Sequence, residues 1–207
     1  MRREHNIQSN SLLDFLQAHD CIFFSPLSQN DTSDWISGNA MTLYSSNSAV
    51  WDAVNGIWKF QKVSGQPMNN SQYYARWNLK ETLVQSVMQW TAIAELLAYD
   101  QSDINLCYDT FPTAWSLSMF GTQGQITQSA QLFYDYNSTS WQDQYRDGIR
   151  ELNYNYGRIY NLFNGCTGIR IGCPTNSSTA KTYGMRNFAV FAKQFTPAEI
   201  NEYFNLI

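Results

Sequence analysis

The feature of this sequence that most restricts its fold is a long series of short apolar segments separated by turn residues. Asn55-Gly56 lies between two of them and accepts the positive φ values of a type I′ hairpin turn. No helix-sized crossover separates the segments, so they predict antiparallel strands in two packed sheets. The segments with this pattern are 21–27, 41–44, 49–54, 56–61, 73–79, 82–88, 91–98, 104–108, 115–120, 130–136, 141–145 and 149–152.

Composition supports a β fold with an uncharged polar surface. Hydrophobic residues make up 43% of the 207 residues and aromatic residues 15%, while charged residues are only 14%, against an average of about 25%. Ser, Thr, Asn, Gln and Tyr fill the positions between apolar residues, as strands with one buried face require. A chain of this length, without a linker rich in Pro, Gly and Ser, predicts a single sandwich domain.

The end of the chain combines an apolar strand around 188–191 with a capped helix. Thr196 supplies an N-cap oxygen, Pro197 follows where its missing N–H costs nothing, and Glu199 can reach back to the cap. This pattern predicts a capping box. A short helix lying flat against the body of the molecule is expected, because its residues form one apolar face at Ile200, Tyr203 and Phe204.

Several short motifs occur in a fixed order along the chain. They are Phe23 to Leu27 followed by Asp34 and Ser37-Gly38, Asp147-Gly148 in QYRDGIREL, Gly168 to Gly172 (GIRIG), and the final TPAEI helix. Together they resemble the opening, a hairpin, the "LRIG" strand and the close of laminin G-like domains, the concanavalin A-like jelly rolls that include the pentraxins. The resemblance covers most of the chain from Cys21 to Ile207. It implies an all-β jelly-roll sandwich over residues 21–207.

Residues 1–20 form an arm ahead of the predicted sandwich. Ser11 can cap a short helix there. The helix can pack on the protein's own sandwich or on another subunit, and the second alternative makes the arm a connector in an oligomer or larger assembly. Its apolar face is formed by Leu12, Leu13, Phe15 and Leu16.

Charge and hydropathy exclude some partners. The net charge is −4 and no basic stripe is present, which argues against nucleic acid. No run approaches the roughly 18 apolar residues of a membrane span. Asp14 interrupts the only apolar run near the N-terminus, so no signal peptide is expected, and a cytoplasmic or virion location follows.

The cysteines fit a chain that is not exported. Cys21, Cys107, Cys166 and Cys173 are widely and irregularly spaced, and free thiols are expected. A bridge between Cys166 and Cys173 is the alternative.

The sequence contains no residue pattern typical of a catalytic site on this scaffold. Glycosidases on this scaffold need two facing carboxylates, and no alternating acidic triplet is present; Glu95, Asp100 and Asp103 are the nearest cluster. Both histidines, His5 and His19, lie in the arm, away from any Ser/His/Asp triad. We expect a protein that is not an enzyme.

Calcium and glycans are the candidate ligands. The resemblance implies calcium at the rim of the sandwich, held by oxygen ligands that Asp100 and Asp103, or Asp135 and Asn137, can supply. The same residues are also ordinary turn formers. Exposed loop aromatics can stack on sugar rings, and the candidates for such stacking are Trp35, Trp141, Tyr154, Tyr156 and Tyr160.

Two functional classes remain open at this point. The first is a non-enzymatic assembly module, such as a capsid-associated, head-fibre or tail protein of a bacteriophage virion. The second is a carbohydrate-binding lectin domain of a bacterial protein, as the resemblance by itself suggests. Fold alone does not decide between them.

Overall fold

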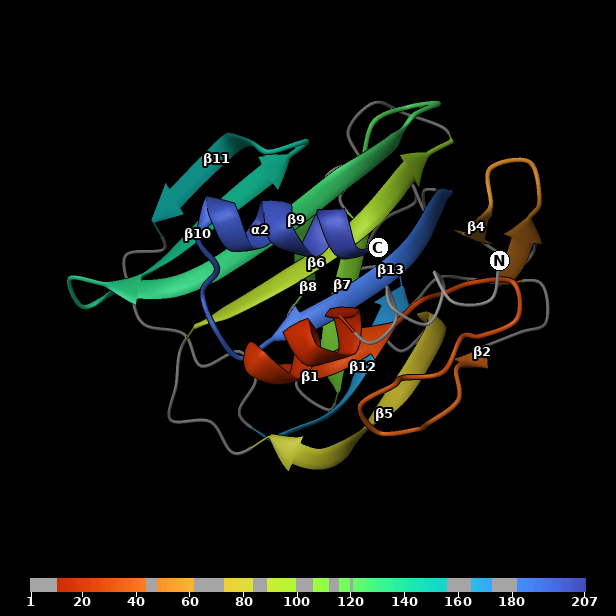
Figure 1. Cartoon of the computed structure of the whole chain (residues 1–207), viewed down its shortest axis with the longest axis horizontal. Helices are drawn as coiled ribbons and strands as arrows, with labels where there is room; N and C mark the ends of the chain where they lie inside the picture. The colour runs from red at the N-terminus through yellow and green to blue at the C-terminus, as the bar shows by residue number, and fades with distance from the viewer. Residues whose placement is uncertain are drawn as a thin grey trace.

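The computed structural model describes residues 11–43, 48–61, 73–83, 89–99, 106–111, 116–119, 121–155, 165–172 and 182–207. Two antiparallel sheets pack face to face as a sandwich, and helices cover the outer face of the larger sheet (Figure 1). This arrangement confirms the predicted two-sheet fold with a short C-terminal helix.

The larger sheet has eight strands in the order β11-β10-β9-β6-β13-β4-β3, with β1 also paired to β13. All of its pairs are antiparallel. Its strands are β1 (Cys21–Ser25), β3 (Ala49–Asp52), β4 (Ile57–Phe60), β6 (Trp90–Ala98), β9 (Ile126–Tyr136), β10 (Thr139–Arg146), β11 (Ile149–Asn155) and β13 (Tyr183–Phe191).

The smaller sheet has five strands in the order β2-β5-β12-β7-β8. Gly168 of the GIRIG motif lies on its central strand, where a Cβ atom would come within 2.6 Å of the Trp77 carbonyl oxygen, so only glycine fits there. The strands are β2 (Thr42–Leu43), β5 (Tyr73–Leu83), β7 (Leu106–Phe111), β8 (Ser116–Met119) and β12 (Cys166–Gly172).

Some strand boundaries differ from those expected. The segments 73–79 and the start of 82–88 form one continuous strand, β5, and residues 84–88 lie outside the described residues. The turn between β3 and β4 takes four residues, and of its Asn55-Gly56 pair only Gly56 has positive φ. It is therefore not the two-residue turn expected. Asp147-Gly148 does form the hairpin turn between β10 and β11, with φ of 48° and 78°.

The core between the sheets is built from aromatic side chains of both sheets. Phe23 packs against Trp77 at a ring-centroid distance of 5.2 Å and against Phe188 at 5.3 Å. Trp90 and Phe133 stack at 5.5 Å. These large, buried rings hold the two sheets together through the hydrophobic effect.

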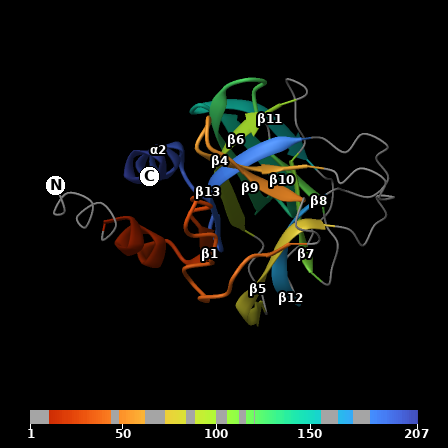
Figure 2. The ribbon, with the colours of Figure 1, turned by 90° about the vertical axis from the view of Figure 1, so that its right-hand side faces the viewer.

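A second apolar cluster covers the outer face of the larger sheet. It contains α2 (Pro197–Leu206), whose predicted capping box is present: Thr196 Oγ1 accepts from the Glu199 backbone N–H, and the Glu199 carboxylate accepts from the Thr196 N–H at 2.7 Å. The predicted face of Ile200, Tyr203 and Phe204 is buried. Figure 2 shows α2 beside the helix of residues 11–18, on one side of the sandwich.

The N-terminal helix belongs to this same cluster. Leu12, Phe15 and Leu16 are at most 7% exposed, and Phe15 packs within about 6 Å of three aromatic rings beneath it. Of the two alternatives for this helix, these three residues follow the first, packing on the protein's own sandwich, because the larger sheet and α2 cover them. Leu13 remains 38% exposed. Ser11 is itself helical and is not a flanking cap.

Two further sequence expectations concern the cysteines and the membrane. Neither Cys21 nor Cys166 forms a disulfide, so the alternative bridge from Cys166 is not present; Cys173 lies outside the described residues. Burial raises the pKa of the Cys21 thiol far above its ordinary value, despite hydrogen bonds to Phe23 and Val190 that act the other way.

Across the described residues, neither helix has the length and apolarity that crossing a bilayer requires.

Candidate ligand-binding site

The outer face of the larger sheet changes character along β9. Alternate residues of a strand share a face, so Ala130 and Leu132 face outward together with Tyr134 and Tyr136. The first two are buried in the cluster beneath the helices. Tyr134 is half-buried beyond that cover, and Tyr136 is 60% exposed. The sheet therefore leaves an aromatic surface open at its β9–β11 edge.

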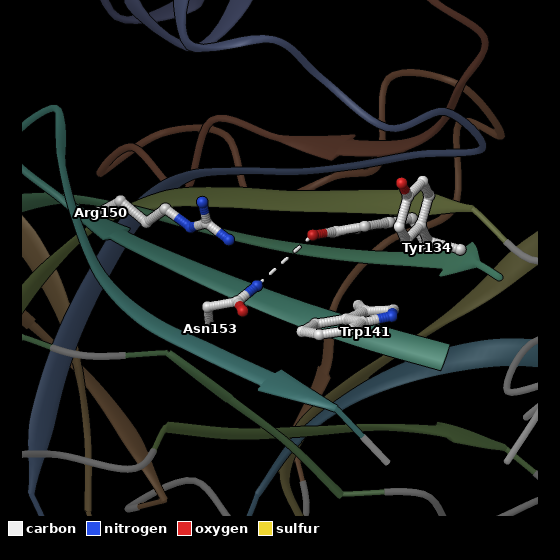
Figure 3. A pocket seen from close by; sticks show the side chains of 5 residues that line it. Tyr134, Trp141, Arg150 and Asn153 are labelled. Atoms are coloured by element: carbon white, nitrogen blue, oxygen red, sulfur yellow. Dashed lines mark hydrogen bonds between the residues drawn. The ribbon is translucent and has the colours of Figure 1, made fainter. Parts of the chain in front are cut away.

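A pocket of about 360 Å³ lies on this open surface. Figure 3 shows the Trp141 indole, the Asn153 amide and the Arg150 guanidinium gathered around the Tyr134 ring. Each of the three edge strands contributes to the pocket. Its lining residues are Tyr134 and Tyr136 from β9, Trp141 from β10, and Arg150 and Asn153 from β11.

One buried carboxylate fixes the polar side of the pocket. Asp143 is 4% exposed. Its Oδ1 accepts from Arg150 Nη2 at 2.7 Å and from Asn153 Nδ2 at 2.6 Å, and its Oδ2 accepts from the Tyr134 hydroxyl at 3.3 Å. Three lining side chains are thus held in place by a fourth that is not part of the lining.

A β-bulge explains why Arg150 and Asn153 share a face. In a regular strand, residues three apart point to opposite sides. Here the register between β10 and β11 shifts between Gln144 and Tyr145, so that Asp143 lies opposite Asn153 while Tyr145 lies opposite Arg150. The extra residue on β11 turns Arg150 to the side of Asn153, where both reach Asp143.

The same contacts set the charges in the pocket. Burial, together with the nearby charge of Asp143, raises the pKa of the Tyr134 hydroxyl. Burial acts to lower the pKa of Arg150, but the hydrogen bond and charge of Asp143 outweigh it and raise that pKa. Tyr134 is therefore a neutral hydroxyl at physiological pH, and Arg150 is a cation balanced by Asp143.

The geometry suits a ligand with one apolar face and several hydroxyl groups. Trp141 is half-buried, with its indole N–H donating to Thr139 Oγ1 at 3.1 Å, which leaves the ring as a fixed apolar platform. Tyr136 offers a second, more exposed ring. Arg150 and Asn153 bring polar groups beside these rings. Aromatic platforms flanked by fixed polar groups are what a sugar ring requires.

Of the five aromatic residues predicted to bind sugars, Trp141 is the one that the described structure brings into this pocket. Tyr154 lies on β11 and is 52% exposed, but strand alternation places it on the face opposite Asn153. Trp35 packs on Phe24 and donates its indole N–H to Asp31 at 2.8 Å. Tyr156 and Tyr160 lie outside the described residues.

Of the two predicted pairs of calcium ligands, the structure describes only Asp135 and Asn137. Asp135 accepts a hydrogen bond from Ser140 at 2.6 Å, and Asn137 takes a positive φ of 50° in the β9–β10 turn, an ordinary role for asparagine. Asp100 and Asp103 lie outside the described residues. Where the structure is described, no three His, Cys, Asp or Glu side chains converge as a metal site would require.

Sequence reasoning missed most of the residues that form the pocket. Tyr134 and Tyr136 could have been found, because the alternation of AQLFYDY places them on the face of Leu132. Arg150, Asn153 and Asp143 could not, because their meeting depends on the bulge in β11.

The fold is similar to that of botulinum neurotoxin binding domains. The serotype D binding domain is 11% identical over 92% of this chain and 52% of its own, with a TM-score of 0.63. The serotype D ligand-binding domain in complex with N-acetylneuraminic acid is 9% identical over 92% and 52%, with a TM-score of 0.61. The neurotoxin DC binding domain in complex with rat synaptotagmin II is 10% identical over 91% and 52%, with a TM-score of 0.61.

These likenesses show the fold, which is the concanavalin A-like sandwich that the motifs suggested. The chain spans about half the length of these structures. No family model matches the sequence, and no curated protein sequence matches it. The three structures are botulinum neurotoxin binding domains.

Proposed function

We propose that this protein is a lectin-like binding module that recognises a glycan through the outer-face pocket of β9, β10 and β11. The ligand's apolar ring face lies on Trp141 and Tyr136, and its hydroxyl groups bond to Arg150, Asn153 and the Tyr134 hydroxyl. The module binds its ligand and does not transform it.

The observation that carries this proposal is the Asp143 network. Arg150, Asn153 and Tyr134 are already held by one buried carboxylate. Fixing a flexible side chain on binding costs about 0.5 to 1.5 kcal/mol, and side chains that are ordered before the ligand arrives avoid most of that cost.

Two further observations support a binding module over an assembly module. Structures with this fold include binding domains whose complexes contain N-acetylneuraminic acid or rat synaptotagmin II. The apolar face of the N-terminal helix, the main argument for a connector, is taken up by the protein's own core at Leu12, Phe15 and Leu16. The hypothesis of a virion assembly module therefore loses its main argument.

The test is binding to a glycan array, followed by calorimetry on the best glycan. Trp141→Ala is expected to weaken binding by about tenfold or more, because it removes the stacking platform. Tyr154→Ala is the matched control: it removes an aromatic ring from the same hairpin but from the opposite face, and is expected to leave affinity unchanged. The proposal is wrong if no glycan binds, or if Tyr154→Ala abolishes binding and Trp141→Ala does not.

A further inference from the structure

A second pocket lies on the same outer face, where β13, β6 and the loop after β1 meet. Its volume is about 390 Å³. The polar part of its wall is formed by side chains of the two central strands, and the apolar part by the loop after β1, by β3 and by the end of the chain. The lining side chains used below are Leu27, Trp51, Glu95, Arg186 and Asn187.

Glu95 and Arg186 form a two-point ion pair in this pocket. Arg186 Nε lies 2.7 Å from Glu95 Oε2, and Nη2 lies 3.1 Å from Oε1. The Glu95 side chain is 13% exposed and that of Arg186 33%. The pair cancels its own charge, so the pocket is polar without favouring an anion or a cation.

A bulge in β13 adds Asn187 to the pair. Arg186 lies opposite Glu95 in the sheet, but the register shifts before Ala189, and Asn187 adopts a φ of +51°. This turn of the backbone lets Asn187 Nδ2 donate to Glu95 Oε2 at 2.8 Å. Two consecutive residues of β13 thus donate hydrogen bonds to the same carboxylate. In a regular strand their side chains would point to opposite faces of the sheet.

Hydrogen-bonding capacity remains after these contacts are counted. Of the five guanidinium N–H groups, Arg186 uses one on Nε and one on Nη2 for Glu95, and one on Nη1 for the Gly56 carbonyl at 3.4 Å. Within the described part of the chain, that leaves two N–H donors of Arg186 and the amide oxygen of Asn187 to meet a ligand. Glu95 Oε1, with one hydrogen bond so far, can accept another.

The pocket also has an apolar wall. Leu27 is fully buried with a positive φ of 48°, an unusual conformation for a branched side chain. Trp51 also lines the pocket; it is half-buried and packs edge-on against Trp58 at 6.1 Å. Donors, acceptors and an indole therefore surround one neutral space.

We infer that this pocket is a second binding site and that its ligand is a neutral polyhydroxylated molecule, a sugar ring without an acidic group. Vicinal hydroxyl groups can accept from Arg186 while donating to Glu95 and Asn187. The C–H face of the ring lies against Trp51. A charged sugar is disfavoured, because the balanced pair offers it no net countercharge. This site stands on its own contacts and does not depend on the function proposed for the first pocket.

The experiment is a nitrogen-15 NMR titration with methyl glycosides of glucose, galactose, mannose and N-acetylglucosamine at millimolar concentrations, with glucuronic acid as the acidic comparison. Binding is expected to shift the Trp51 indole and Arg186 Nε signals with at least one neutral glycoside. Trp51→Ala is expected to weaken that binding by about tenfold or more.

Two variants keep the test interpretable. Asn187→Gly tolerates the positive φ while removing the amide, and is expected to weaken binding with the fold intact. Trp141→Ala alters the first pocket and is expected to leave the Arg186 and Trp51 shifts unchanged, so failure of one site is distinguishable from failure of the other. The inference is overturned if no neutral glycoside shifts these signals, if glucuronic acid alone does, or if the Arg186 Nε shift persists undiminished in both Trp51→Ala and Asn187→Gly.

Discussion

The centre and the two flanks of the outer face are built from the same strands but serve different purposes. At the centre, α2 and the helix of residues 11–18 cover Ile93, Ala130 and Leu132, and the surface is buried and apolar. On one flank, Tyr134 and Trp141 stand open beside Arg150. On the other flank, the Glu95 and Arg186 pair lies in a second pocket.

The difference lies in backbone regularity. Where the strands pair without interruption, alternation sends one apolar residue in every two toward the helices. At each flank a bulge places an additional polar residue on the outer face: Arg150 joins Asn153 on β11, and Asn187 joins Arg186 on β13. In both cases the gathered side chains converge on one carboxylate, Asp143 or Glu95. The bulges in β11 and β13 thus lie where the covered face becomes a pocket.

The largest loss of stability is expected when packing at the centre of the outer face is removed. Phe15→Ala deletes a 5% exposed ring that contacts Phe191, Phe195 and Tyr203. Losing such a buried ring typically costs about 3 to 5 kcal/mol of unfolding free energy, which urea unfolding would measure. The matched control is Leu13→Ala on the same helix, expected to change stability by about 0.5 kcal/mol or less because Leu13 is 38% exposed. Equal effects of the two variants would show that the helix is not part of the core.

A smaller effect is expected at the first flank. Asp143→Asn keeps the shape of the side chain but removes the charge that holds Arg150 and Asn153. We expect a loss of about 1 to 2 kcal/mol, because the Arg150 side chain is 46% exposed and water replaces part of the interaction. Glycan affinity at the first pocket should fall, while the glycoside shifts at Trp51 stay as they are.

Asp135→Asn serves as the control for that variant. Asp135 is on the adjacent strand β9, but its hydrogen bond to Ser140 lies on the opposite face. Its replacement should leave glycan affinity unchanged. If Asp143→Asn binds as tightly as the unaltered protein, the buried carboxylate does not organise the pocket.

The sequence predicts the centre of this face far better than its flanks. The apolar strand at 188–191, the Thr196 capping box and the helix face of Ile200, Tyr203 and Phe204 all depend on local spacing, and all are present. The pockets depend on register instead. A one-residue shift exchanges the faces of a strand, and nothing in IRELNYN or MRNFAV indicates where the shift falls. Trp141 was found because it is aromatic, whereas Asp143 was missed because its partners are brought together only in the folded sheet.

The smallest expected effect concerns α2, which separates the two flanks. Glu199 accepts hydrogen bonds from Lys193 and from the Thr196 backbone at the start of this helix. Partial burial acts to raise the pKa of Glu199, but these bonds outweigh it and hold that pKa below its ordinary value of 4.5. A carboxyl group whose pKa is lower in the folded than in the unfolded state stabilises the fold. This contribution is complete above the unfolded-state pKa and is lost as the pH falls through the folded-state pKa. Thermal melts between pH 7 and pH 3 should therefore show less acid destabilisation in Glu199→Gln. At pH 7 this variant is expected to be less stable by about 1 kcal/mol or less, because Gln can still accept from the Thr196 N–H but loses the charged bond with Lys193. Glu202→Gln removes the same charge from an exposed position of the same helix and should keep the full acid sensitivity. If the two variants lose stability in parallel as the pH falls, the ionised Glu199 carboxylate does not stabilise the start of α2.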